Sequence, residues 1–535
     1  MTIIQARPTH RHTRKGAADD TAMARRARRN TIGDAIGRAA ARYCDRVALR
    51  FGERAWSYAA LDAASSAIAG HLPSLGMAAG DRVVAFGRNS DHYLLCWLAC
   101  CKAGLVHVPA NYALTATELG YIVEQSGARL LLHEPGLADI VQAAGAAVQP
   151  FASIMPPDGA HTAPNEAVAD EDIAQILYTS GTTGAPKGAM LTHRALLSEY
   201  VSCITACEFT DRDRTLAALP LYHTAQMHCF AMPQLLAGAE IMLIDGPAPP
   251  LCLELIERHR LTSFFAPPTV WINLLRHPDF ATRDLRSLNK AYYGAAIMPV
   301  PILHELRQRL PGIRAFNCYG QSEISPLATV LAPEEHDARP ASVGRPVLNV
   351  RTRVVDLSMD DVAPGTHGEI IHRSPQLMLG YWGKPEETAQ AFEGGWFHSG
   401  DVGYFDAEGF LYVVDRIKDV INTGGVQVAS REVEDALFTH PAVSEVAVIA
   451  VPDPKWIEAV AAVIVLRDGA EVSEAVLIEH AQATLAPYKL PKRVFFAESL
   501  PKNTAGKLLK RELRLRYGST GSAVLGLETD RFGPE

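Results

Sequence analysis

The chain has 535 residues, of which 48% are hydrophobic and 21% charged, a composition typical of folded globular proteins. This length exceeds the usual domain size of about 100–200 residues, so a single compact core is not expected. The net charge of −8, from 59 acidic and 51 basic residues, argues against a nucleic-acid-binding protein. No apolar run approaches the roughly 18 residues of a membrane span. We therefore predict no such span and a cytoplasmic location.

The nine cysteines are spread thinly along the chain. Their odd number argues against a disulfide framework and fits a reducing compartment. Two groups lie close in sequence, namely Cys96, Cys100 and Cys101, and Cys203 and Cys207. Neither group has the His/Cys spacing of a zinc site, so we interpret these cysteines as small buried hydrophobic residues.

Residues 1–30 are rich in arginine but also contain Asp19 and Asp20, and no apolar segment follows them. A secretory signal is therefore not predicted, and the acidic pair disfavours a transit peptide. We expect a disordered basic tail, or a start codon assigned upstream of Met23.

From residue 31 onward, short apolar runs alternate with helical patterns. We predict strands at 81–86, 106–109 and 129–133, a helix at 92–104, and a further helix that a Thr115–Glu118 capping box opens. A polar stretch at 156–172 is predicted to be a surface linker. The βαβ order predicts an α/β fold, with a large N-terminal domain of helix-covered, mainly parallel sheets.

A domain boundary is predicted near residues 416–418. A strand at 410–414 precedes a charged run there, and a smaller α+β unit with strands at 443–451 and 459–466 follows it. We therefore expect an N-terminal domain at 31–415, a hinge at 416–418, a mobile C-terminal domain at 419–515 and a flexible tail at 516–535.

The segment behind a predicted strand at 173–178 carries the strongest local signal. It combines glycines, whose backbone N–H groups can approach an anion, with hydroxyl donors and a lysine, and this combination is typical of a polyphosphate cradle. It is not a Walker A loop, because no Gly-Lys-Ser/Thr follows four free positions. The segment reads Tyr178, Thr179, Ser180, Gly181, Thr182, Thr183, Gly184, Ala185, Pro186, Lys187 and Gly188.

This segment resembles the signature loop of the adenylate-forming superfamily, which includes acyl-CoA synthetases, luciferases and the adenylation domains of nonribosomal synthetases. Further family segments match in order, namely those that end at Glu323, Asp401, Asp419 and Lys507. The resemblance covers roughly residues 31–513. It implies that ATP is bound by Thr179, Ser180, Gly181, Thr182, Thr183, Gly184, Lys187, Ala295, Tyr319, Ser322, Asp401 and Arg416.

The resemblance also implies residue roles. Thr179 and Glu323 would hold Mg²⁺, since a carboxylate beside a triphosphate needs a cation between them. Asp401 would accept hydrogen bonds from the ribose hydroxyls. Lys507 would bridge the acid and the α-phosphate, where two anions meet. Lys418 would be the pivot of the hinge, and Glu323, His223 and Lys507 would be the catalytic residues.

The implied acyl pocket comprises Tyr222, His223, Gln226, Gly294, Ala296 and Cys318, and the implied approach for CoA comprises Gly424, Gly425 and Trp456. No additional Arg or Lys stands in the segments around this pocket. We therefore predict that the protein is an AMP-forming acid–thiol ligase that activates a hydrophobic monocarboxylic acid, fatty or aryl. Its small-molecule partners would be ATP, Mg²⁺, the acid and CoA, and a homodimer is left open.

Several positions depart from the family pattern on the side that would accept CoA. The family usually has proline at 430 and glycine at 457, where this chain has Ser430 and Ile457, and Val426 and Gln427 also differ. An amide ligase that transfers the acyl group to an amine therefore stays an alternative. A nucleotide-binding protein without turnover is disfavoured, because Lys187, Glu323, Asp401 and Lys507 are all present. A multidomain synthetase module is not expected, because only about 20 residues follow the end of the resemblance at residue 513.

Overall fold

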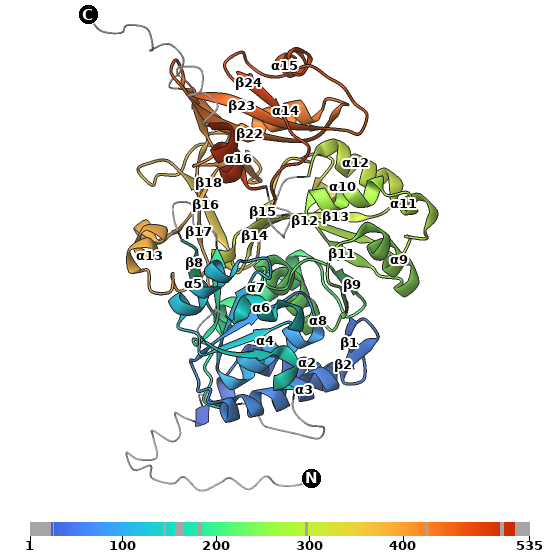
Figure 1. Cartoon of the computed structure of the whole chain (residues 1–535), viewed down its shortest axis with the longest axis vertical. Coiled ribbons are helices and arrows are strands. Elements are labelled where there is room, and N and C mark those ends of the chain that lie inside the picture. The colour runs from blue at the N-terminus through green and yellow to red at the C-terminus, as the bar shows by residue number, and fades with distance from the viewer. Residues whose placement is uncertain are drawn as a thin grey trace, which may run out of the picture.

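The computed structural model describes residues 23–24, 26–142, 146–155, 165–179, 185–294, 298–423, 426–502 and 508–518. These residues form four sheets. Three sheets lie in the first 416 residues, and the fourth, with its helices, forms the unit coloured orange to red at one end of the long axis (Figure 1).

The first sheet has the order β6-β5-β3-β4-β7-β8, and its strands are parallel except for the antiparallel pair β7–β8. Three predicted strands are confirmed here, as β3, β4 and β5, within one residue at each end. The strands are β3 (Arg82–Phe86), β4 (Val106–Ala110), β5 (Leu130–His133), β6 (Ala147–Pro150), β7 (Ile173–Thr179) and β8 (Lys187–Thr192).

Helix α4 (Asp91–Ala103) is the predicted helix at 92–104, and it is buried on almost every face. It packs against α2 (Ile32–Tyr43), α3 (Tyr58–His71) and the first sheet, which explains why its sequence is apolar all round. It ends at Gly104, whose φ of +76° favours glycine. The predicted capping box is also confirmed, because the Thr115 side chain and Glu118 cap α5 (Ala116–Ser126) reciprocally.

The second sheet has nine strands in the order β15-β14-β13-β12-β11-β9-β10-β1-β2. The central strands are parallel, and antiparallel pairs close both edges. Its strands are β1 (Val47–Phe51), β2 (Arg54–Ser57), β9 (Arg214–Ala217), β10 (Glu240–Leu243), β11 (Ser263–Phe265), β12 (Lys290–Gly294), β13 (Arg314–Gly320), β14 (Leu327–Leu331) and β15 (Arg345–Pro346). The remaining helices of this region are α6 (Ala138–Val141), α7 (His193–Ala206), α8 (Met232–Ala237), α9 (Pro249–His259), α10 (Pro268–Arg276), α11 (Asp279–Thr282) and α12 (Val300–Arg309).

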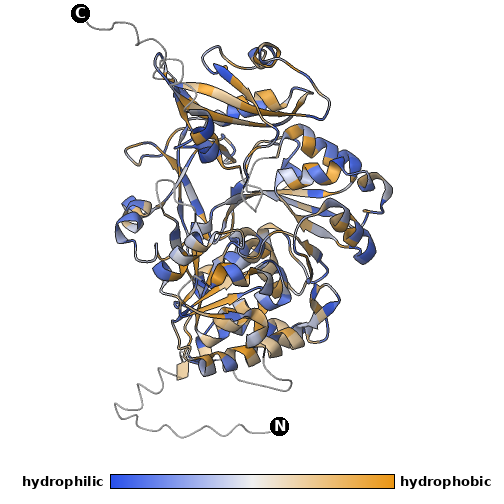
Figure 2. Cartoon of the chain, viewed as in Figure 1, coloured by the Kyte–Doolittle hydropathy of each residue, from blue (hydrophilic) through white to orange (hydrophobic). Residues whose placement is uncertain are grey.

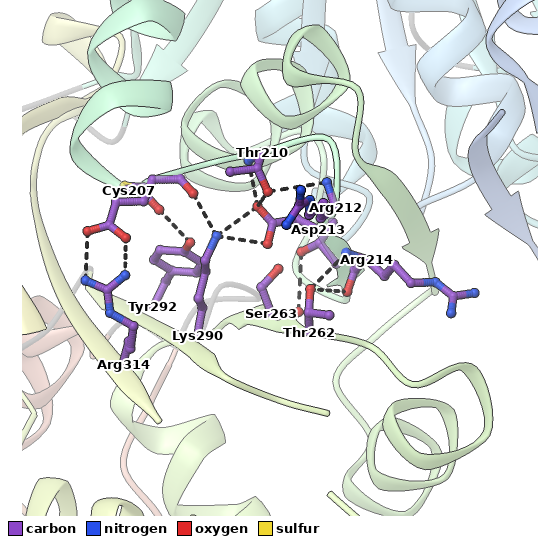
Figure 3. Close-up of polar contacts among 12 residues, drawn as sticks. Cys207, Thr210, Arg212, Asp213, Arg214, Thr262, Ser263, Lys290, Tyr292 and Arg314 are labelled. Carbon is purple, nitrogen blue, oxygen red and sulfur yellow. Dashed lines mark hydrogen bonds and ion pairs between the residues drawn. The ribbon is translucent and has the colours of Figure 1, made fainter. Parts of the chain in front are cut away.

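A network of hydrogen bonds and ion pairs lies at the amino-terminal ends of the parallel strands in the second sheet (Figure 3). Lys290 donates to both carboxylate oxygens of Asp213 at 2.9 Å and to the Glu208 carbonyl at 2.7 Å. The Tyr292 hydroxyl donates to the Cys207 carbonyl at 2.7 Å. In open sheets of this kind, ligands bind at the carboxyl ends of the parallel strands. A ligand site is therefore expected at the ends of these strands that lie opposite this network.

The third sheet is wholly antiparallel, with the order β16-β17-β18-β19, and the sequence patterns did not predict it as a separate sheet. Its strands are β16 (Arg351–Val355), β17 (Gly368–Arg373), β18 (Phe397–Phe405) and β19 (Leu411–Arg416), and α13 (Pro385–Ala391) lies between β17 and β18 in sequence. The strand predicted at 410–414 is β19. The predicted hinge at 416–418 begins at Arg416, the last residue of β19, and precedes the first strand of the fourth sheet.

The fourth sheet has the order β21-β20-β23-β22, with β24 paired to β23. Its long strands β22 (Val443–Asp453) and β23 (Ile457–Leu466) confirm the strands predicted at 443–451 and 459–466. Both are strongly hydrophobic in Figure 2, and their side chains belong to two buried clusters, one on each face. The other elements are β20 (Ile421–Thr423), β21 (Val426–Val428), β24 (Arg493–Phe496), α14 (Ser430–Phe438), α15 (Glu474–Gln482) and α16 (Lys510–Gly518).

The predicted fold class, a large N-terminal part of mainly parallel, helix-covered sheets followed by a smaller α+β unit, is confirmed. Within the described parts of the chain, no helix combines the length and the apolar character that a membrane crossing needs.

Candidate active site

The two strands that flank the predicted phosphate loop bring Thr179 and Lys187 opposite one another. Thr179 ends β7, Lys187 begins β8, and the two residues are register partners in the antiparallel pair. Gly188 follows, and a Cβ there would lie 2.6 Å from the Ile176 side chain, so the close approach of the two strands requires glycine. The hairpin therefore presents a hydroxyl and an ammonium group on adjacent strands.

Glu323 lies next to this hairpin, in the short 3₁₀ turn that follows β13. Its Oε1 accepts hydrogen bonds from the Thr179 hydroxyl at 3.4 Å and from the Tyr381 hydroxyl at 3.1 Å. The turn depends on Gly320, because a Cβ there would lie 1.8 Å from the Pro326 carbonyl oxygen. The predicted metal pair, Thr179 and Glu323, is thus brought together from segments 144 residues apart.

Tyr381 is a residue of this site that the sequence analysis missed. Its hydroxyl bonds Glu323, and the Lys187 ammonium lies 5.2 Å from the centre of its ring. Burial, followed by the neighbouring Glu323, raises the pKa of Tyr381, so its hydroxyl stays protonated and donates. A tyrosine between a glycine and a tryptophan carries no chemical signature of its own, so only the fold reveals its position.

Tyr319, Asp401 and Arg416 form a second group. The Tyr319 hydroxyl donates to Asp401 Oδ2 at 2.7 Å, and Arg416 Nε lies 3.5 Å from Asp401 Oδ1. Burial and the neighbouring Asp401 carboxylate raise the pKa of Tyr319 well above its usual value, which keeps the phenol a donor. Asp401 on β18 and Arg416 on β19 are also register partners, so the third sheet sets their spacing.

Among the described residues of the predicted acyl pocket, Gly294 and Cys318 lie near the carboxyl ends of β12 and β13, and the others lie in the segment that follows β9, namely Tyr222, His223 and Gln226. Gly294 and Cys318 are register partners, and a Cβ at Gly294 would lie 2.3 Å from the Cys318 carbonyl oxygen. Tyr222 packs against His223 with ring centres 4.7 Å apart, and Gln226 accepts from the Leu219 backbone N–H at 3.2 Å. All these residues except His223 are buried, His223 being half-buried.

The Ser322 hydroxyl lies 3.1 Å from the Thr224 hydroxyl, and this contact connects the Glu323 turn to the segment of Tyr222 and His223. Thr224 was not among the predicted residues, although it directly follows His223. Gln226 lies in a seven-residue π-helix, Ala225–Ala231, a rare element that often marks functional sites.

The predicted residues beyond β19 are spread over the hinge and the fourth sheet. Lys418 is exposed, and Asp419 beside it pairs with Arg514 of α16. Trp456 lies in the turn between β22 and β23, and the ammonium groups of Lys455 and Lys492 lie 4.7 and 6.0 Å from the centre of one of its rings. Other predicted site residues lie outside the described residues, namely Ser180, Gly181, Thr182, Thr183, Gly184, Ala295, Ala296, Gly424, Gly425 and Lys507.

Ile457, one of the departures from the family pattern, has a φ of +68°, and the residue is 67% exposed. This left-handed conformation suits glycine and is costly for a β-branched residue. The structure therefore explains why glycine is usual at this position, and Ile457 occupies it at a cost in backbone strain.

Two family models match successive parts of the chain, and a relative of known activity matches most of its length. The family model of the AMP-binding enzymes matches residues 36–382, and the model of the AMP-binding enzyme C-terminal domain matches residues 432–507. A feruloyl-CoA synthase from an Amycolatopsis species is 38% identical over 474 residues, which cover 88% of this chain and 96% of that protein.

Two solved structures are similar over nearly the whole chain. The ATP-bound MatB of Rhodopseudomonas palustris has a TM-score of 0.85 at 30% identity and covers 91% of this chain and 99% of its own. The amide bond synthetase McbA of Marinactinospora thermotolerans has a TM-score of 0.83 at 28% identity and covers 91% and 100%. The chain therefore belongs to the AMP-binding enzyme family, in the adenylate-forming superfamily that includes the acyl-CoA synthetases, as its motifs predicted.

Proposed function

We propose that the protein activates a hydrophobic monocarboxylic acid with ATP and transfers the acyl group to CoA. The proposal rests on the proximity of three side chains, those of Thr179, Lys187 and Glu323. Together they place a cation beside two oxygen ligands, as a metal–polyphosphate site requires. In the first step the carboxylate attacks the α-phosphorus, and the bond to pyrophosphate breaks. In the second step the CoA thiolate attacks the acyl carbonyl, and the carbon–oxygen bond to AMP breaks.

Thr179 and Glu323 fit a magnesium ion, because their hard oxygen atoms lie 3.4 Å apart and belong to the ligand types that Mg²⁺ prefers. A bound ion would supply positive charge against the phosphates. Lys187 would contact the phosphates as a compact cation. Asp401, held by Tyr319, would accept the ribose hydroxyls, and Arg416 would contact the nucleotide from the hinge.

The acid would enter between Tyr222, Gln226, Gly294 and Cys318, with His223 at its carboxylate end. These walls are mostly apolar, with Gln226 and Cys318 as mild exceptions, and the carbonyl oxygen of Gln226 already accepts a hydrogen bond from the Leu219 backbone. A fatty or aryl acid with one carboxylate suits such walls, and the feruloyl-CoA synthase relative is named for an aryl acid. A second carboxylate would be buried without a cation, which is costly.

The part of the chain beyond the hinge would act as a lid. Residues 416–418 would be the hinge between domains at 31–415 and 419–515, and Lys507 would bridge the acid and the α-phosphate in the first step. For the second step, Trp456 with Lys455 and Lys492 offers an aromatic face and two cations to the anionic CoA. Residues 424–425 would border the same approach. A cytoplasmic location and a homodimer stay predictions.

An amine acceptor is the second candidate, and Ile457 is the observation that favours it. Its exposed, β-branched side chain stands where the family usually has glycine, next to Trp456 on the side that CoA would approach. Such a side chain narrows this approach without changing the adenylation residues. The likeness to an amide bond synthetase agrees with this alternative.

The test is to incubate the purified protein with ATP, Mg²⁺ and a panel of fatty, aryl and dicarboxylic acids, and to measure pyrophosphate and AMP separately. With CoA as the acceptor, AMP release should require both CoA and a hydrophobic monocarboxylic acid. If AMP is released only when an amine is added, the amide-ligase alternative is correct. Highest turnover with a dicarboxylic acid would contradict the proposed pocket.

Two variants serve as controls. Lys507→Ala should lower pyrophosphate release about 100-fold or more, the usual effect of removing a group that stabilises transition-state charge. Ile457→Gly should leave pyrophosphate release unchanged and alter only acceptor-dependent AMP release. A change in both steps would show that Ile457 acts on the fold of the C-terminal unit and not on the acceptor.

A further inference from the structure

Residues 378–382 form a bridge between the Glu323 turn and the phosphate hairpin. The Met378 backbone N–H donates to the Glu323 carbonyl at 2.8 Å, and the Trp382 N–H donates to the Gly188 carbonyl at 2.8 Å. Between them, Leu379 and Gly380 exchange backbone hydrogen bonds with Met190 of β8 at 2.9 and 3.0 Å. The backbone on either side of Tyr381 is therefore fixed relative to both parts of the site.

The bridge is fixed from its outer side as well. The Tyr381 N–H donates to the Thr388 hydroxyl at 2.9 Å. Gly380 has a φ of +147°, and a Cβ there would lie 2.6 Å from the Thr388 side chain. Only glycine allows this approach, so the backbone that leads into Tyr381 is held in place on this side as well.

The half-buried side chain of Tyr381 then reaches both charged partners of the site. Its hydroxyl donates to Glu323 Oε1 at 3.1 Å, on the same oxygen that accepts from Thr179. The centre of its ring lies 5.2 Å from Lys187 Nζ, within the range of a cation–π contact. One side chain thus contacts an anion through its hydroxyl and a cation through its ring.

We propose that Tyr381 is a positioning residue for adenylation, which orients Glu323 toward Mg²⁺ through its hydroxyl and Lys187 toward the phosphates through its ring. The inference rests on the proposed function. A carboxylate that is already oriented loses less conformational freedom when it binds a metal, and partners that orient metal ligands commonly change affinity 10–100-fold. The ring contact is weaker and changes affinity only several-fold.

The two contacts can be separated by substitution. Tyr381→Phe removes the hydroxyl and keeps the ring, whereas Tyr381→Leu removes both. Binding is measured by isothermal titration calorimetry without a carboxylic acid, once with ATP and excess Mg²⁺ and once with ATP and EDTA. Tyr381→Phe should weaken Mg·ATP binding about tenfold and leave ATP binding in EDTA unchanged. Tyr381→Leu should weaken both, with a several-fold loss in EDTA.

Tyr43→Phe is the matched control, because the Tyr43 hydroxyl donates a hydrogen bond at 3.0 Å to the Ala237 carbonyl, a contact between α2 and α8 that involves neither strand of the hairpin. It should match the wild-type protein in both titrations. Mg·ATP binding by Tyr381→Phe that equals the wild type would overturn the inference. An equal loss with Mg²⁺ and with EDTA would also overturn it, because the hydroxyl would then act on the fold. If the wild-type protein bound no ATP at all, the proposed function itself would fail.

Discussion

Glu199 is a fully buried carboxyl group on α7. Its Oε1 accepts hydrogen bonds from the Cys203 thiol and the Leu327 backbone N–H, both at 3.0 Å, and its Oε2 accepts from the Gln376 amide at 2.6 Å. Burial raises the pKa of Glu199 to about 8, although the bonds from Cys203 and Leu327 lower it. This residue connects α7 to β14 and to the segment that leads to Tyr381.

The raised pKa of Glu199 predicts that stability falls as the pH rises. The folded protein binds the proton more tightly than the unfolded chain, whose pKa is near the ordinary value of 4.5. The protonated Glu199 therefore makes its full contribution to the free energy of unfolding below pH 4.5. As the pH rises from 4.5 to 8, this contribution falls by on the order of 4 kcal/mol. Urea unfolding across this range, in wild type and Glu199→Gln, measures it, and the variant should show a flatter dependence.

Glu254→Gln is the control for this measurement, because Glu254 is a glutamate of α9 whose side chain is 45% exposed. It should retain the pH dependence of the wild-type protein. A Glu199→Gln variant whose stability changes with pH as steeply as that of the wild type would show that Glu199 does not hold its proton in the folded state.

Helix α14 depends on a residue from the other side of the predicted hinge. It begins at Ser430, and the methyl side chain of its N-cap residue Ala429 cannot accept a capping hydrogen bond. Instead, Asp415 Oδ2, which precedes the hinge, accepts from the Ser430 backbone N–H at 2.6 Å and from the Ser430 hydroxyl at 2.8 Å. Lys510 of α16 donates to the same hydroxyl at 2.7 Å. A carboxylate at a helix N-terminus is well placed, and here it joins the two sides of the predicted hinge.

Ser430 should therefore restrain the hinge. A proline at this position would suit the first turn of a helix but would offer Asp415 neither an N–H nor a hydroxyl. Ser430→Pro should increase local opening at residues 416–418 about tenfold, since a hydrogen bond to a charged group contributes about 1.5–3 kcal/mol. The rate of limited tryptic cleavage at the exposed Lys418 measures this opening.

Ser473→Ala is the control for hinge opening. Ser473 caps α15 in the same C-terminal unit, with its side chain accepting from the Val476 N–H, and it does not border the hinge. Its substitution should leave cleavage at Lys418 unchanged. If Ser430→Pro is cleaved no faster than the wild type, Asp415 and Ser430 do not restrain the hinge.

At the scale of the whole molecule, the features that the sequence predicted are local ones. The strands around 81–133 and 443–466, the capping box at Thr115 and the glycine end of α4 were correct, because hydrophobic periodicity and capping residues act within a few positions. Thr179, Lys187 and Glu323 could be predicted as candidate site residues because glycines and hydroxyls surround them in recognisable segments.

The features that the sequence did not predict depend on distant pairing. The third sheet and the antiparallel edges of the second were missed, because strand pairing between distant segments leaves no local pattern. Tyr381 was missed for the same reason, since its partners Lys187 and Glu323 lie 194 and 58 residues away in sequence. The left-handed conformation of Ile457 was also unforeseen, because a β-branched residue indicates extended backbone.

The central claim is that the acid attacks the α-phosphorus of ATP, and isotope transfer tests it most directly. The protein is incubated with Mg²⁺, ATP, CoA and a turned-over acid that carries ¹⁸O in its carboxylate, and the products are analysed by mass spectrometry. If acyl-AMP is the intermediate, the AMP should carry one ¹⁸O atom from the acid and the pyrophosphate none. Label in inorganic phosphate with ADP as the co-product, or AMP without label, would contradict the account.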